Sequence, residues 1–142
     1  MSCCNIFEKF DVKNNLIKEY EHWVLVVRKN HVCLGSCVAI TKRHHDLLGD
    51  LSSEEMSEYQ KVALDVESAL KDSFQFEVIH HLLLMVKDKH THFHIIPWYK
   101  TEKTFANVKW IDDLKEVPLG KHNMVSQNVL DEIRDEIKSK IS

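Results

Sequence analysis

The sequence predicts an α+β fold, in which a mainly antiparallel sheet of about five strands carries one long central helix and a C-terminal helix. Residues 22–28 and 36–41 are rich in β-branched and aromatic types, which favour strands. Residues 51–72 show helical periodicity, and residues 76–86 and 89–99 are two more extended segments. A chain of 142 residues suits one domain, so we expect a single domain over residues 1–142.

The first part of the chain predicts a hairpin. Residues 1–21 are polar with scattered apolar positions, and we expect a short helical turn at 16–20. Residues 22–28 then form a buried strand, and residues 36–41 return beside it in the antiparallel sense. Gly35, just before the second strand, permits the tight backbone geometry of the turn.

The central helix has a clear start. Ser52 and Glu55 have the spacing of a capping box, in which each side chain bonds the backbone N–H of the other. We expect the helix to end near Asp72. Its predicted apolar stripe consists of Met56, Tyr59, Ala63, Val66 and Leu70.

The second half predicts a hairpin and a last helix. A polar turn at 87–89 joins residues 76–86 and 89–99 as a tight hairpin at the centre of the sheet. Pro97 has no N–H for a ladder, so regular pairing should stop there or move to an edge. Residues 104–111 predict an edge strand, and residues 118–120 a break. A C-terminal helix is predicted over about 126–141, with Leu130, Ile133, Ile137 and Ile141 on its apolar stripe.

Composition excludes several functions. A net charge of -3 offers no basic face for a nucleic acid polymer. The longest apolar run, residues 82–86, is far shorter than a membrane span, so we expect no membrane partner. The N-terminus lacks the pattern of a secretory signal, which predicts a cytoplasmic protein. The four cysteines, at positions 3, 4, 33 and 37, do not form a disulfide framework and are expected to be free thiols.

Three alternating histidines are the main chemical feature. His90, His92 and His94 fall at every second residue, so in a strand their imidazoles share one face while the intervening side chains enter a core. One interpretation is that they line a polar, solvent-facing side of the sheet. A second is a His-x-His metal site, which needs a further ligand. The first carboxylate after His94 is Glu102, and no glycine lies between Gly49 and Gly120.

The third interpretation is covalent phosphoryl or nucleotidyl chemistry. A neutral imidazole is a competent nucleophile toward phosphorus, and a flanking histidine can bind phosphate oxygens or donate a proton. Alternate side chains of a strand stand about 7 Å apart, which brackets a phosphate group. One strand face can therefore hold both the nucleophile and its helpers.

The run from His90 to Ile96 resembles the signature of the histidine-triad (HIT) family of nucleotide hydrolases and transferases. The segment 35–44 also resembles the glycine, apolar strand and basic-basic-histidine segment of that family, so the resemblance covers about residues 22–99. The resemblance implies a HIT-like fold, a nucleotide as small-molecule substrate and a two-fold homodimer. The glycine-free hairpin that ends in Met85-Val86-Lys87-Asp88 resembles bacterial diadenosine-polyphosphate hydrolase-like members.

The resemblance also implies residue roles. His92 matches the nucleophile, which would form a nucleotidyl-histidine intermediate, while His90 and His94 match the flanking histidines that orient it and bind phosphate. His44 matches a histidine that assists the same cluster. We expect His92 to be openly accessible with these three rings gathered around it. His45, in contrast, is expected at the surface.

The chain departs from the family pattern at several positions. Residues 85–89 replace a Gly-Gln-Ser/Thr loop, although Lys87 or Lys89 could supply charge to the phosphate. Arg28 stands where the family has an aspartate that binds the ribose. His80 stands near a family asparagine and is either a phosphate-facing donor or a half-buried strand residue. Phe7, three residues after Cys4, replaces the second cysteine of zinc-binding members, so we expect neither a structural zinc nor another cofactor.

These observations predict a hydrolase with a covalent intermediate. Its expected substrate is a dinucleoside polyphosphate or a nucleoside phosphoramidate, and the covalent step should need no metal. The alternatives are a catalytically weak nucleotide-binding protein with this fold, and a His-x-His metal-binding protein.

Overall fold

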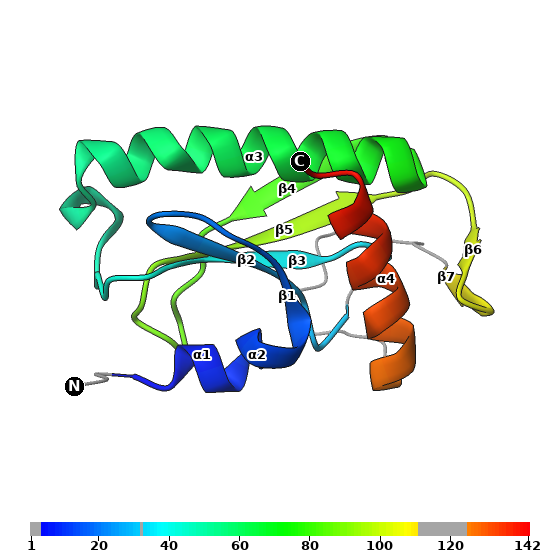
Figure 1. The fold of residues 1–142 in the computed structure, drawn as a ribbon, viewed down its shortest axis with the longest axis horizontal. Helices are drawn as coiled ribbons and strands as arrows, with labels where there is room; N and C mark the ends of the chain where they lie inside the picture. Colours follow the sequence, from blue (N-terminus) through cyan, green and yellow to red (C-terminus); the bar gives the residue numbers. More distant parts are fainter. Residues whose placement is uncertain (1–3, 32, 111–124) are drawn as a thin grey trace.

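A five-stranded antiparallel sheet divides the molecule into two layers, with α3 on one face and the short helices α1 and α2 on the other (Figure 1). The computed structural model describes residues 4–31, 33–110 and 125–142. The strand order is β1-β2-β3-β5-β4. The sheet consists of β1 (Leu16–Glu19), β2 (Trp23–Val27), β3 (Cys37–Thr41), β4 (Val78–Leu82) and β5 (His92–Trp98). The predicted α+β class and the five-stranded antiparallel sheet are therefore confirmed.

Helices cover both faces of this sheet. They are α1 (Ile6–Lys9), α2 (Val12–Asn15), the 3-10 helix η1 (Leu48–Asp50), α3 (Ser53–Phe74) and α4 (Gln127–Ser139). The main core lies between the sheet, α3 and α4, and α4 buries Leu130, Ile133 and Ile137 as predicted. A smaller apolar cluster, which includes Ile6 and Phe10, lies on the opposite face under α1.

The pairing register of β2, β3 and β5 places His92 and His94 directly across from apolar residues of the neighbouring strand. His92 lies opposite Ile40 of β3, and His94 lies opposite Val38. Ile40 and Val38 are in turn paired with Val24 and Val26 of β2. Since paired residues share a face of the sheet, the histidines stand beside the apolar cluster that α1 covers. The same register lets Phe93 face α3, where its ring lies 4.4 Å from that of Tyr59.

The central helix begins as predicted, but its buried stripe is shifted. Ser52 and Glu55 form the capping box. Met56, predicted to be buried, is 46% exposed. Val66 and Leu70 are buried as predicted, and the rest of the buried face consists of Glu55, Val62, Ala69 and Phe74.

Gly35 is required for the close contact between the β2–β3 turn and α3. Its φ of +88° lies in the left-handed region, which glycine adopts without steric cost. A Cβ at this position would meet Cδ2 of Leu70 at 2.7 Å and Cδ2 of Phe74 at 3.2 Å. The turn therefore rests against α3 only because residue 35 has no side chain.

Three predicted elements differ from the structure. Residues 16–19 are strand β1 rather than a helical turn, because pairing with β2 overrides the local preference. Strand β4 is an edge strand rather than a central one, and residues 83–91 join it to β5 by a long connection instead of a tight turn. Strands β6 (Lys103–Phe105) and β7 (Val108–Trp110) form a separate hairpin. Position 111 and the break expected at 118–120 lie outside the described residues.

Pro97 lies where β5 loses one neighbour. Pairing of β5 with β3 reaches Ile95, whereas pairing with the edge strand β4 continues through Pro97 to Trp98. The predicted change of pairing at this proline is confirmed.

Within the described ranges, no helix is both long and apolar enough to cross a membrane.

Glu55 ties the loop after β3 to the start of α3. Its buried carboxylate accepts hydrogen bonds from Arg43 Nη2 at 2.9 Å and from His45 Nε2 at 2.9 Å, besides the cap bond from the Ser52 N–H. Burial acts to raise the pKa of Glu55, but the bonds from Arg43, Ser52 and His45 outweigh it and lower that pKa to about 2. His45 is therefore not the surface residue we expected, since its side chain is 10% exposed.

We predict that Glu55→Gln lowers the free energy of unfolding at pH 7 by about 1–3 kcal/mol, because a buried charged network loses its acceptor. A lowered pKa stabilises the fold above the ordinary carboxyl value and ceases to do so as pH falls toward 2. The deficit of the variant should thus shrink between about pH 4.5 and pH 2. Urea unfolding at several pH values measures it, with the exposed Glu54→Gln as control; equal stability of both variants at pH 7 contradicts the prediction.

Candidate active site

His92 is held in one tautomer by the backbone. Its Nδ1 lies 2.6 Å from the carbonyl oxygen of His90. Because a carbonyl oxygen only accepts, Nδ1 must carry the hydrogen, and in the neutral ring Nε2 then holds a lone pair. Burial lowers the pKa of His92, so the ring is neutral at pH 7. The structure thus presents an imidazole nitrogen in the state that a nucleophile needs.

His94 lies directly beside His92. The two ring centroids are 4.9 Å apart, in an edge-to-face arrangement. Burial lowers the pKa of His94 to about 3, with further contributions from His92 and Arg28. Its Nδ1 is buried and has no hydrogen-bond partner among the described residues. A buried polar atom without a partner costs about 1–3 kcal/mol, which marks this ring as one whose partner is a ligand or water.

The N-terminal segment covers this pair. The Phe10 ring lies 5.6 Å from that of His92 and 6.1 Å from that of His94. Lys9 Nζ forms an ion pair at 2.5 Å with Asp88, which links α1 to the β4–β5 connection. His92 is only 2% exposed. The open access that we expected for its ring is therefore not found, because the ring is buried beside Phe10.

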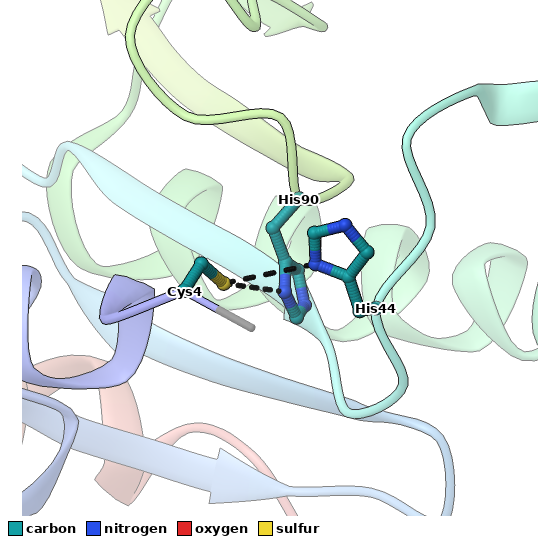
Figure 2. A group of neighbouring side chains, drawn as sticks. All are labelled: Cys4, His44 and His90. Carbon is teal, nitrogen blue, oxygen red and sulfur yellow. Dashed lines mark hydrogen bonds between the residues drawn. The ribbon is translucent and has the colours of Figure 1, made fainter. Parts of the chain in front are cut away.

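His90 and His44 form a second group together with Cys4 (Figure 2). The Sγ atom of Cys4 lies 3.2 Å from Nδ1 of His90 and 3.7 Å from Nδ1 of His44. The centroids of the two imidazole rings are 5.1 Å apart. The structure therefore gathers the four predicted histidines as two neighbouring pairs, only one of which contains the proposed nucleophile.

The far nitrogen of each ring in this second group is also engaged. His90 Nε2 donates to the carbonyl oxygen of Thr41 at 2.6 Å, and His44 Nε2 donates to Asp46 at 2.5 Å. Both Nδ1 atoms therefore turn a lone pair toward Cys4. A single thiol hydrogen can satisfy only one of them. Neither His90 nor His44 has a ring nitrogen directed at His92 in this arrangement.

These three side chains are suited to a metal ion. Their ligand atoms all lie within 4.8 Å of one another, and imidazoles whose other nitrogen bonds a carbonyl or carboxylate are typical zinc ligands. Cys4 is the residue that sequence reasoning missed, because we looked for a second cysteine at position 7. The contact joins residues far apart in the chain, so no local spacing indicated it.

The remaining predicted residues lie around the site. His80 lies on β4 opposite Ile96, and its Nδ1 donates to the Ile96 carbonyl oxygen at 2.9 Å. Lys87 is exposed in the β4–β5 connection. Arg28 follows β2 and is half-buried, and its Nε has no hydrogen-bond partner among the described residues. The roles of His80 and Lys87 toward phosphate remain predictions.

Solved structures share this architecture. A hypothetical histidine triad nucleotide-binding protein from Sulfolobus tokodaii aligns with a TM-score of 0.72 and 19% identity, over 96% of this chain and 89% of that one. A Hit-like protein involved in cell-cycle regulation from Bartonella henselae aligns at 0.71 and 18%, over 99% and 100%. A Zn-bound histidine triad family protein from Mycobacterium smegmatis aligns at 0.68 and 14%, over 96% and 94%.

No protein-family model and no curated protein matches the sequence. The structural likeness nevertheless extends over nearly the whole described chain, from the N-terminal segment to α4. We conclude that this chain has the fold of the histidine-triad proteins.

Proposed function

We propose that this protein is a nucleotidyl hydrolase that works through a covalent intermediate on Nε2 of His92. The observation that carries the proposal is the hydrogen bond from His92 Nδ1 to the His90 carbonyl, because it leaves Nε2 unprotonated. The histidine-triad fold supports the nucleotide as substrate class. The substrate is a dinucleoside polyphosphate or a nucleoside phosphoramidate.

The reaction has two steps. In the first, the Nε2 lone pair attacks the phosphorus that bears the nucleoside, a P–N bond forms, and the bond from phosphorus to the leaving group breaks. The leaving group takes the bonding electrons and a proton from His94, which the bound phosphate keeps protonated. In the second step, water attacks the phosphorus and gives a proton to the now neutral His94, the P–N bond breaks, and its electrons return to Nε2. The products are a nucleoside monophosphate and the protonated leaving group.

The neighbouring residues assist this chemistry. The His90 carbonyl accepts from Nδ1–H throughout and stabilises the positive charge that the ring acquires on attack. His94 lies in ring contact with the nucleophile, and a bound phosphate raises its pKa by charge attraction. It is then the group nearest to the nucleophile that can exchange a proton with the leaving atom.

A two-fold homodimer is part of this proposal. Strand β4 is an edge of the sheet, and Val78 on this strand is 46% exposed. On the adjacent helix α3, Leu64 is 60% exposed. An uncovered strand edge with apolar side chains favours pairing with a second chain, and a second copy would join the two sheets.

We predict a nucleotidyl adduct on His92 when the protein is mixed briefly with adenosine phosphoramidate or diadenosine tetraphosphate. Intact mass followed by peptide mapping measures it. His92→Ala and His92→Asn should abolish both adduct and turnover, because each lacks the attacking nitrogen. The control His81→Ala removes a histidine from the opposite face of the sheet, where His81 bonds Tyr59 and Glu67, and should keep the adduct. Nucleotide binding with no adduct on any such substrate indicates instead a binding protein with this fold.

The contact between the rings of Phe10 and His92 gives a second prediction, on the accessibility of His92. Phe10→Ala should raise the rate at which diethyl pyrocarbonate modifies His92, because the ring that contacts it is removed. Peptide mass mapping over time measures this rate. Phe76→Ala, which removes a partly buried ring packed against the main core, should leave it unchanged. Equal rates in the Phe10 variant and the unmodified protein would show that Phe10 does not limit access.

A metal site is a second candidate function. We propose that Cys4, His44 and His90 bind a divalent ion such as zinc, because both Nδ1 lone pairs converge on the sulfur of Cys4. A bound ion would fasten the N-terminal segment to the loop after β3 and to the start of β5. Its positive charge would stabilise a Cys4 thiolate, and the ion would take no direct part in the proposed covalent step.

We predict about one equivalent of zinc in protein purified without chelator, measured by elemental analysis. Cys4→Ser and His44→Ala should each lose most of it, because three ligands cannot be reduced to two without a large loss of affinity. His81→Ala should keep it. Chelator treatment should leave the His92 adduct in place if that site only supports the fold. Protein that stays metal-free after dialysis against zinc would disprove the site.

A further inference from the structure

Arg28 lies on the histidine face of the sheet, one row beyond His94. In β2 and β3, Val26 lies opposite Val38, and Val38 lies opposite His94 on β5. Arg28 is two residues beyond Val26, and its backbone N–H donates to the Ser36 carbonyl at 2.8 Å. Because alternate residues of a strand share a face, the Arg28 side chain leaves the sheet on the same side as His92 and His94.

The backbone of Arg28 is fixed by a buried histidine. His31 accepts the Gly35 N–H on Nε2 at 2.9 Å and donates from Nδ1 to the Arg28 carbonyl at 3.0 Å. Burial lowers the pKa of His31 to about 4, so the ring is neutral at pH 7 and keeps both of these hydrogen bonds. The start of the arginine side chain is therefore rigidly placed at the end of β2.

The guanidinium of Arg28 has no acidic partner among the residues described. Its Nη1 donates to the Asn30 carbonyl, and its Nε is buried without a hydrogen-bond partner. The other cation close to the histidines, Lys9, is already paired with Asp88. A half-buried guanidinium without a carboxylate retains a planar set of donors, which matches the oxygens of a phosphate.

The backbone of Arg28 is far from that of His92, which favours a partner other than the reacting phosphate. Arg28 is two strands from His92, or about 10 Å across the sheet, and four residues along it, or about 13 Å. An arginine side chain spans only part of that diagonal. Its charge acts on both rings, because it contributes to the lowered pKa of His92 and to that of His94. A group that bonds Arg28 therefore lies about one sugar or one phosphate unit away from the phosphorus at His92.

We propose that Arg28 determines substrate specificity by binding a second phosphate group of the nucleotide, separate from the phosphate that His92 attacks. This inference rests on the proposed function, since it places a nucleotide at His92. The second phosphate is either attached to the sugar or part of a longer phosphate chain. Both have the same chemistry at the arginine, and the experiment distinguishes them.

Binding calorimetry tests the proposal without requiring turnover. The probes are adenosine monophosphate, with one phosphate, adenosine 3′,5′-bisphosphate, with a sugar phosphate, and adenosine diphosphate, with a longer chain. The unmodified protein should bind one of the two doubly phosphorylated probes about tenfold or more tightly than the monophosphate. Arg28→Ala should remove this advantage and leave the monophosphate affinity nearly unchanged. Arg28→Lys should restore part of it, and the exposed neighbour Lys29→Ala should keep all of it.

Two kinds of result would overturn the inference. Equal weakening of all three probes in Arg28→Ala would place the arginine on the reacting phosphate, and a lack of preference in the unmodified protein would show that no second phosphate is bound. Failure of every probe to bind also overturns it. Thermal unfolding of each variant, together with the Arg28→Lys result, separates loss of the contact from loss of the fold. Absence of the His92 adduct alongside the expected Arg28 pattern would reject the hydrolase but not this binding role.

Discussion

The chemistry proposed for this protein depends on one hydrogen bond, from Nδ1 of His92 to the carbonyl oxygen of His90. The bond lies within a short stretch of chain, where β5 begins, so the backbone itself determines which ring nitrogen is free. It can do so because the planar peptide that joins His90 to Thr91 is held in place, since its N–H, on Thr91, donates to the His45 carbonyl oxygen at 2.9 Å. The side chain of His90 is held separately, by the Thr41 carbonyl and by Cys4.

The four histidines thus form two pairs of rings with different proposed roles. His92 and His94 form a neutral, buried pair with an unsatisfied nitrogen, which suits a substrate. His90 and His44 form an anchored pair, because their Nε2 atoms bond the Thr41 carbonyl and Asp46 and their Nδ1 atoms both face Cys4 of the N-terminal segment (Figure 2). The same segment carries Phe10 over His92. A change at Cys4 would therefore affect both the anchor and the access to the nucleophile, which links the proposed metal site to the proposed reaction.

Much of the fold could be predicted from the sequence, because its signals are local. The capping box of Ser52 and Glu55 lies within four residues, and the alternation that puts His92 and His94 on one face needs only the geometry of a strand. The errors arose where distant pairing decides the outcome. Strand β1 forms because β2 lies beside it, and β4 is an edge because β3 pairs with β5.

The contacts of the site were not predictable in the same way, because they join residues far apart in sequence. They are the approach of Cys4 to His90, the packing of Phe10 on His92 and the hydrogen bonds of His45 with Glu55. Arg28 was noticed only as the loss of an expected aspartate, and its unsatisfied guanidinium could be seen only in three dimensions.

The tautomer of His92 is the most direct test of this account. Long-range ¹H–¹⁵N correlation spectra at neutral pH, with the His92 signals assigned by comparison with His92→Asn, report the protonation of each ring nitrogen separately. The account predicts a neutral ring with hydrogen on Nδ1 and an unprotonated Nε2. A neutral ring with its hydrogen on Nε2, or a ring protonated on both nitrogens at pH 7, would contradict it, because no lone pair would then be available to attack phosphorus.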